Sequence, residues 1–233
     1  MKGIILAAGK GTRLHPLTLK KPKGLLKIGN ETILDRLVSQ FHECGIKDVL
    51  IVVGHQKEMI MQHFGDSVRY SHYTNFENTN NLHTLWSIKE ELNEDVLISF
   101  ADLVLHNSII KNLIHTNYDI TMAIDTSQVL ESTMRVSITS DRIKDITSTS
   151  IKEADGNFIG IAKMNKNGCE LLVKEMSSLI NSHYQDYYTI AIDKIARKGM
   201  IVNYFDVKSH LWREIDTKKE YDELIKIYDK FSN

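Results

Sequence analysis

Short runs of aliphatic and β-branched residues alternate, along the first half of the chain, with longer segments in which apolar residues recur every three or four positions. We expect strands over residues 2–8, 48–54, 68–73, 96–105 and 119–125. We expect helices over residues 31–45, 56–65, 81–92 and 108–116. The runs near residues 4–8 and 50–53 show no polar alternation, which is typical of parallel strands covered on both faces. The pattern predicts an α/β fold with an open, doubly wound sheet.

The pattern changes from about residue 134, where short strands separated by polar turns predict an antiparallel or mixed extension of the sheet. These strands are expected over 134–139, 142–148 and 158–164. Helical periodicity follows over 168–180, 186–199 and 218–231, with a further strand at 201–207. Because the sequence contains no repeat, low-complexity tract or linker, we expect one domain over residues 1–233.

Composition narrows the class of partner. The 233 residues, 42% of them hydrophobic, can bury a substantial core, and 29 basic residues nearly balance 30 acidic ones. We therefore expect small-molecule partners, no nucleic acid and no membrane. The two cysteines, Cys44 and Cys169, have no metal-binding or disulfide spacing, and no apolar run approaches the length of a membrane span. These features favour a cytoplasmic protein.

The first expected strand runs into the stretch LAAGKGTRLHPLTLKKPKGLL, residues 6–26. Open α/β sheets bind ligands beyond the carboxyl ends of their strands, and glycines there allow backbone N–H groups to approach phosphate oxygens. Arg13 and Lys23 add positive charge. A tight turn with solvated lysines would also explain the glycines taken alone. The stretch matches neither standard phosphate loop, since GxxxxGK[ST] is absent and Leu14 replaces the third glycine of GxGxxG.

The whole stretch resembles the signature of the sugar-phosphate and phosphocholine nucleotidyltransferases. The matching positions are Gly9, Gly11, Thr12, Arg13, Pro16, Pro22 and Lys23. The resemblance implies a Rossmann-like, doubly wound mixed sheet with helices on both faces and a small antiparallel extension. It also implies a nucleotide-binding half over about residues 1–130 and an acceptor-binding half over about 131–233.

Two further segments resemble the metal-binding segments of this family. VLISFADLVL resembles the strand that carries one metal-binding aspartate, here Asp102, and WREIDTKKEYDEL resembles the closing segment that carries the second, here Asp216. Taken singly, Asp102 is as easily a loop cap and Asp216 a helix cap. In the reaction that the resemblance implies, the phosphate of an acceptor attacks the α-phosphorus of a nucleoside triphosphate. The reaction therefore brings two polyanions together, and Mg²⁺ held by two carboxylates would reduce their repulsion. We expect Arg13 to bind the β- and γ-phosphates and Lys23 to contact the α-phosphate and the acceptor phosphate.

The resemblance also suggests which residues contact the nucleotide, and residue type suggests which contact the acceptor. The nucleotide-binding candidates are Leu6, Ala7, Ala8, Gly9, Gly11, Thr12, Asn80, Asn81 and Thr84. Helix capping explains either asparagine equally well. The acceptor candidates are Lys163, Tyr187 and Tyr188. The two tyrosines, together with Trp86, could face a quaternary ammonium group, although ordinary packing would also explain these aromatic residues. Lys163 could instead be a solvated surface lysine.

The second half looks closer to small CTP-dependent members that activate phosphocholine, aminoethylphosphonate or related compounds, although Asn157 and Ile190 stand where those relatives often carry acidic residues. The leading hypothesis is Mg²⁺-dependent transfer of CMP from CTP to a small phosphomonoester or phosphonate, with release of pyrophosphate. The alternatives are a hexose-1-phosphate uridylyl- or thymidylyltransferase, a noncatalytic nucleotide-binding regulator, and an unrelated doubly wound domain with a coincidental glycine loop. The apolar stripe at residues 221–228 leaves an oligomer possible.

Overall fold

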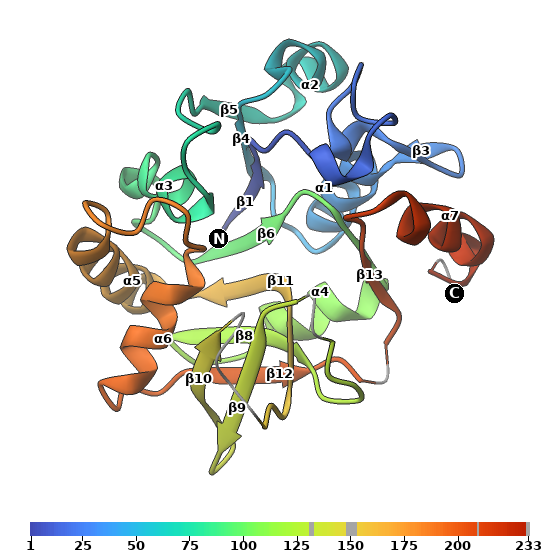
Figure 1. Ribbon diagram of the computed structural model, residues 1–233. Helices are drawn as coiled ribbons and strands as arrows, with labels where there is room; N and C mark the ends of the chain where they lie inside the picture. The colour runs from blue at the N-terminus through green and yellow to red at the C-terminus, as the bar shows by residue number, and fades with distance from the viewer. Residues whose placement is uncertain (131–132, 148–152, 209, 232–233) are drawn as a thin grey trace.

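The computed structural model describes residues 1–130, 133–147, 153–208 and 210–231. A mixed nine-stranded sheet forms its centre (Figure 1). Its strands are β1 (Lys2–Ala7), β4 (Asp48–Val53), β5 (Arg69–His72), β6 (Val96–Phe100), β8 (Ile120–Asp125), β9 (Arg135–Thr139), β10 (Arg142–Thr147), β11 (Gly156–Met164) and β12 (Asn203–Asp206). Two small antiparallel sheets pair β2 (Lys27–Ile28) with β3 (Glu31–Thr32), and β7 (Leu103–Leu105) with β13 (Trp212–Glu214).

The strand order confirms the predicted mixed sheet. It runs β10-β9-β11-β6-β1-β4-β5, and β8 pairs with both β11 and β12. Strand β1 lies parallel to β4 and β6, as the apolar runs predicted, whereas β11 lies antiparallel to β6, β8 and β9. The carboxyl ends of β1 and β6 therefore lie next to each other at one edge of the sheet.

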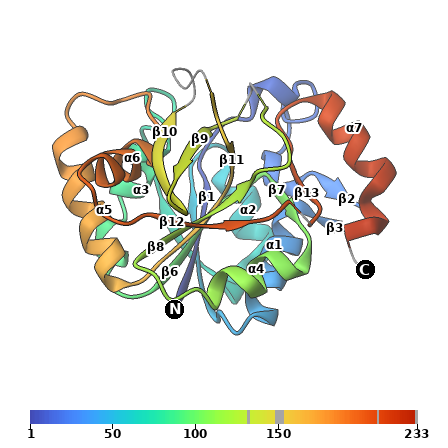
Figure 2. The same ribbon diagram turned by 90° about the horizontal axis from the view of Figure 1, so that it is seen from below.

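Helices cover both faces of the sheet. They are α1 (Ile33–Glu43), α2 (Lys57–Phe64), α3 (Asn81–Trp86), α4 (Asn107–Ile114), α5 (Lys166–Leu179), α6 (Thr189–Arg197) and α7 (Lys218–Ile227). Figure 2 shows α3, α5 and α6 on one side of the sheet and α1 and α4 on the other. Each side has its own cluster of buried apolar residues, as a sheet covered on both faces requires. None of the described helices is long and apolar enough to cross a membrane.

Two of the expected elements are interrupted. Residues 96–105 form two strands rather than one, because the chain turns at Ala101-Asp102: β6 stays in the main sheet, while β7 pairs with β13. The main-chain oxygen of Asp102 accepts a hydrogen bond from the Ile215 N–H at 3.0 Å, which fixes this turn. The helix expected over 81–92 ends at Trp86, where the Ser87 hydroxyl bonds to the Thr84 carbonyl oxygen at 2.7 Å and competes with continued helix.

A third cluster of buried apolar residues joins α7 to the N-terminal hairpin, which is formed by β2 and β3. Ile28 and Ile33 contact it from one end of the chain, and Leu224 and Phe231 from the other. Arg36 of α1, only 6% exposed, crosses this junction: its guanidinium donates to the Phe231 carbonyl oxygen at 2.7 Å and to the Tyr228 hydroxyl at 3.1 Å. The apolar side of α7 thus packs within the chain itself.

We expect Arg36→Ala to lower the free energy of unfolding by about 3 kcal/mol, because it removes charged donors from buried oxygen atoms and leaves a cavity. Arg142→Ala, at an exposed position of β10, is the matched control and should change stability by about 0.5 kcal/mol or less. Urea unfolding of both variants measures the difference. Equal losses for the two arginines would contradict the anchoring role of Arg36.

Candidate functional site

A cavity of about 280 Å³ opens at the carboxyl ends of β1 and β6. It lies where open α/β sheets bind ligands. It brings together most of the site residues predicted from the sequence: Leu6, Ala7, Ala8, Gly9, Gly11, Thr12, Arg13, Lys23, Asn80, Asn81, Thr84, Asp102, Tyr187 and Asp216. Pro22 of the opening motif lines it as well. The remaining lining residues, to which the sequence analysis gave no site role, are Gly24, Ile60, Phe76, Thr79, Phe100, Ala101 and Glu214.

The glycine loop has a backbone geometry that depends on Gly11. Its φ of 61° lies in the left-handed region, and a Cβ at this position would lie 3.2 Å from Lys23 Cβ. The Thr18 hydroxyl donates to the Gly11 carbonyl oxygen at 2.7 Å and closes the loop. The loop can therefore approach Lys23 closely, which a larger residue at position 11 would prevent.

Lys23 connects three segments that are distant in the sequence. Its Nζ donates to Asp102 Oδ2 and to Asp216 Oδ1, each at 2.6 Å. Burial by itself lowers the pKa of Lys23, but the charges of the two aspartates and their hydrogen bonds raise it above its ordinary value. Lys23 is therefore a fixed cation at the centre of the cavity.

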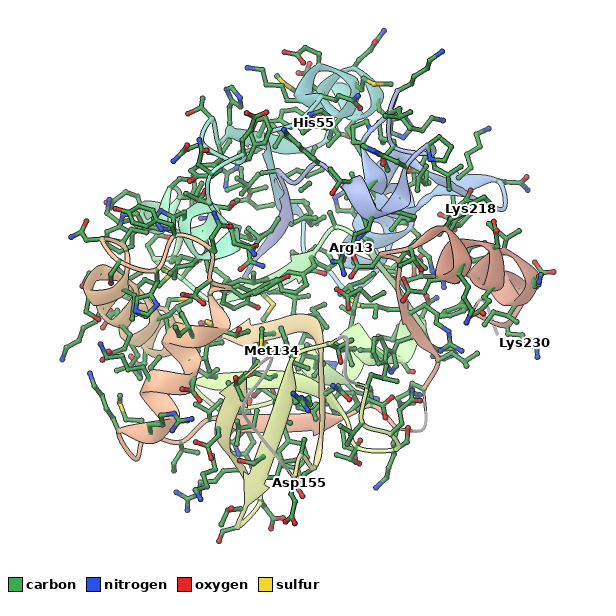
Figure 3. The ribbon with its side chains drawn as sticks, viewed as in Figure 1. Arg13, His55, Met134, Asp155, Lys218 and Lys230 are labelled. Carbon is green, nitrogen blue, oxygen red and sulfur yellow. The ribbon has the colours of Figure 1, made fainter. Side chains whose placement is uncertain are left out.

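Arg13 contacts one of these two carboxylates, that of Asp216. Its Nη2 lies 2.8 Å from Asp216 Oδ2, and its side chain is 59% exposed. Figure 3 shows Arg13 between the N-terminal loop, drawn in blue, and the C-terminal segment, drawn in red. The two cations predicted from the opening motif thus meet the C-terminal aspartate.

Three carboxyl groups gather at this point. Asp102, Glu214 and Asp216 each offer an oxygen within 4.8 Å of the others. Asp102 Oδ1 is buried and accepts no hydrogen bond from the described residues. Burial, together with the charges of Asp102 and Asp216, raises the pKa of Glu214 to about 8. The sequence signal that could have indicated Glu214 is its position in WREIDT, the same closing segment that indicated Asp216.

The structure also decides between functional and capping interpretations for some residues. Thr217, not Asp216, caps α7, so the Asp216 carboxylate is free to face Lys23 and Arg13. Asn80 does cap α3, since its Oδ1 accepts the Asn81 N–H at 2.8 Å. Asn81 Oδ1 accepts the Tyr188 N–H, also at 2.8 Å.

The three acceptor candidates lie in different surroundings. Tyr187 lines the cavity, with its ring centroid 6.3 Å from that of Phe100. Tyr188 is fully buried. Lys163 is 6% exposed; it pairs with Leu97 in the first half of β6, and its ammonium donates to the Thr116 carbonyl oxygen. Neither Tyr188 nor Lys163 is among the described residues that line the cavity.

Trp86 and Asn157 each interact with another residue of the protein. Trp86 lies outside the described lining of the cavity, and Lys89 Nζ sits 4.9 Å from the centre of its ring. Asn157 is fully buried, and its amide bonds to both the N–H and the carbonyl oxygen of Leu130. The Asn157 side chain therefore fixes the local backbone.

The strand that leads to Asp216 is anchored by Trp212. Its indole N–H donates to Asp125 Oδ2 at 2.8 Å, and both side chains are buried. Burial by itself raises the pKa of Asp125, but hydrogen bonds from Ser127 and from Trp212 outweigh it and hold the pKa below its ordinary value. At neutral pH the indole therefore donates to an ionised carboxylate.

Comparison with known proteins gives the same assignment as the opening motif. Residues 2–134 match the nucleotidyl transferase family. The chain belongs to that family. It is 35% identical over 111 residues to a UTP–glucose-1-phosphate uridylyltransferase of Haloferax volcanii, covering 46% of this chain and 45% of that protein. It is 33% identical over 121 residues to a choline-phosphate cytidylyltransferase of Streptococcus pneumoniae, covering 51% and 52%.

These alignments span about half the length of the curated relatives. A solved structure of the CTP:phosphocholine cytidylyltransferase from Streptococcus pneumoniae superposes with a TM-score of 0.81 at 24% identity, covering 97% of this chain and 98% of that one. At this identity the likeness establishes the fold. The predicted doubly wound α/β class is therefore confirmed over nearly the whole chain.

We expect Asp125→Asn to lower the free energy of unfolding by about 1–2 kcal/mol at pH 7, because the indole loses a charged acceptor. Because the pKa of Asp125 is lower in the folded protein than in the unfolded chain, ionised Asp125 stabilises the fold at pH values above the unfolded pKa, near 3.8. This stabilisation is lost as the pH falls through the folded pKa. Urea unfolding from pH 7 to pH 3 should therefore show the variant's deficit shrinking below about pH 4. Asp141→Asn, in an exposed turn, is the control; a deficit independent of pH would contradict the argument.

Proposed function

We propose that the chain is a nucleotidyltransferase that transfers CMP from CTP to a small phosphomonoester or phosphonate and releases pyrophosphate. The observation that carries this proposal is the contact of Lys23 with both Asp102 and Asp216, beside a glycine loop at the carboxyl ends of β1 and β6. Fixed cations and clustered carboxylates side by side suit a reaction between two polyanions. Membership of the nucleotidyl transferase family supports it.

In this reaction an oxygen of the acceptor phosphate forms a bond to the α-phosphorus of the nucleotide. The bond from the α-phosphorus to the oxygen that bridges it to the β-phosphorus breaks, and pyrophosphate leaves with that electron pair. The protein supplies no covalent nucleophile. Its residues orient the two phosphates and stabilise the charge that moves onto the leaving group.

The two cations have separate tasks in the proposed reaction. Lys23 is held rigidly, so it can neutralise charge shared by the α-phosphate and the acceptor phosphate without reorganising. Arg13 is largely exposed at the mouth of the cavity and can bind the β- and γ-phosphates in a bidentate manner. The loop from Gly9 to Thr12 adds backbone N–H groups beside these charges.

The carboxylates suit a divalent cation. Their oxygens are the hard ligands that Mg²⁺ prefers, and the buried Asp102 Oδ1 lacks a hydrogen-bond partner among the described residues. We assign Asp102 and Asp216 as its ligands. When bound, Mg²⁺ neutralises charge on the triphosphate oxygens and so reduces repulsion of the incoming acceptor. Glu214 adds a third carboxyl oxygen at the same place.

The nucleotide half, about residues 1–130, and the acceptor half, about 131–233, form part of the same proposal. Tyr187 and Phe100 give the cavity an aromatic side that suits an acceptor with an apolar or cationic portion. Similarity to the choline-phosphate cytidylyltransferase supports CTP and a small acceptor. Similarity to the glucose-1-phosphate uridylyltransferase supports the second candidate, a hexose-1-phosphate uridylyl- or thymidylyltransferase. Free thiols at Cys44 and Cys169 agree with the cytoplasmic location that we propose.

Pyrophosphate release tests the proposed reaction. Purified protein with Mg²⁺ is incubated with CTP, UTP or dTTP and with phosphocholine, aminoethylphosphonate, phosphorylated amino-acid derivatives or hexose 1-phosphates. We expect release with CTP and one of the small acceptors. Release only with UTP or dTTP and a hexose 1-phosphate would establish the second candidate instead. Nucleotide binding without release from any pair would support a noncatalytic regulator.

We expect Lys23→Met to lower kcat by about a hundredfold or more, since loss of one preorganised charge typically costs ~3 kcal/mol of transition-state stabilisation. Lys20→Met, at an exposed position of the same loop, is the matched control and should retain wild-type kcat. Thermal unfolding of both variants separates lost catalysis from lost folding, because Lys23 also neutralises two carboxylates. Equal kcat values for the two variants would remove Lys23 from the mechanism.

A further inference from the structure

The chain between α5 and α6 lies against the start of α3 (Figure 1). Three of its carbonyl oxygens accept hydrogen bonds from that segment. The bonds are Asn80 N–H to Tyr184 O at 2.8 Å, Asn80 Nδ2 to Gln185 O at 3.2 Å and Leu82 N–H to Asp186 O at 3.3 Å. The rings of His83 and Tyr184 also stack, with centroids 5.2 Å apart. We call residues 184–188 the α6 entry loop.

Asn81 supplies the last connection, and it is the one next to the cavity. Its side-chain Oδ1 accepts the Tyr188 N–H at 2.8 Å, at the peptide that joins Tyr187 to Tyr188. Tyr187 and Asn81 both line the cavity, whereas Tyr188 is buried with its ring 6.0 Å from that of Phe100. One bond therefore fixes the backbone between a tyrosine that faces the cavity and a tyrosine in the core.

The hydrogen bond also fixes the orientation of the Asn81 amide. A backbone N–H can only donate, so the carbonyl oxygen of the amide must face Tyr188. The Nδ2 group then occupies the other position, and it donates to no residue in the described part of the chain. Asn80 differs, because its Oδ1 and its Nδ2 both have partners within the protein. Asn81 alone of the pair keeps a free donor beside the cavity.

We propose that Asn81 is a positioning residue that couples the two halves of the cavity: its carbonyl oxygen holds the α6 entry loop so that Tyr187 faces the acceptor, while its Nδ2 is available to the nucleotide. The acceptor assignment of Tyr187 rests on the proposed function, whereas the bond between Asn81 and Tyr188 does not. A nucleotide that binds Nδ2 restrains this side chain and thereby the loop, so nucleotide and acceptor favour each other's binding.

Hydrogen exchange of the α6 entry loop tests the structural part without any substrate. We expect the Tyr188 amide to exchange about tenfold faster in Asn81→Ala, which removes the accepting oxygen. Asn81→Asp keeps an accepting oxygen at that position, so its Tyr188 amide should stay protected. Asn165→Ala is the matched control: Asn165 caps α5 with a side chain that bonds to Gly168 and Asp119, outside the described lining of the cavity. An unchanged Tyr188 amide in Asn81→Ala, or equal acceleration in Asn81→Asp, would overturn the proposal.

Kinetics test the functional part. At saturating nucleotide, Asn81→Ala should raise the acceptor KM about tenfold, matching the lost hydrogen bond, and should change kcat less. Tyr187→Ala should also raise the acceptor KM, but it should add little in the Asn81→Ala background, because both changes disturb one element. Fully additive effects, or a change in the nucleotide KM alone, would overturn the coupling. Absence of pyrophosphate from the wild type with every substrate pair would instead end the proposed function and leave the exchange result intact.

Discussion

The contact of Lys23 with Asp102 and Asp216 is the constraint on which the rest of the site depends. The three residues come from the loop after β1, the turn after β6 and the segment after β13, so none can meet without the completed sheet. Without neighbouring cations, the three carboxyl groups at this edge would repel one another when ionised. Lys23 and Arg13 neutralise two of them, and the raised pKa of Glu214 reduces the charge of the third. The fold thus assembles a charge arrangement that suits polyphosphate chemistry.

The C-terminal segment is held at this edge by contacts that are remote from the cavity. Trp212 bonds to Asp125 of the main sheet, the main chain of Ile215 bonds to Asp102, and α7 packs against the N-terminal hairpin across Arg36. Each contact restrains a different part of the segment that carries Asp216. A site built from both ends of the chain requires such anchors, because an error of about 1 Å in a catalytic group can cost on the order of a hundredfold in rate.

The sequence predicted the element types well where periodicity was strong, and it failed where a local break served the site. The run at 96–105 is apolar except at Ser99 and Asp102, so its pattern indicates one strand. The structure divides it because Asp102 and Ala101 turn out of the main sheet, and β7 then pairs with β13, a partner more than a hundred residues away. Pattern reasoning has no access to that pairing. Asn157 similarly proved to be a buried backbone partner of Leu130, which only the packed structure reveals.

By itself, the sequence determined the α/β class, the loop after the first strand and the four charged residues at the centre of the site. Hydrophobic periodicity reports which residues face a core. The four charged residues were indicated by three segments that resemble those of the nucleotidyltransferases: the opening motif for Arg13 and Lys23, and two later segments for Asp102 and Asp216. The tertiary structure alone decided that Glu214 joins the aspartates, that Lys163 and Tyr188 lie outside the described lining of the cavity and that Asn81 binds the backbone at Tyr188. These outcomes depend on distances between segments far apart in sequence. Those distances are set by strand order and helix packing, which local patterns do not contain.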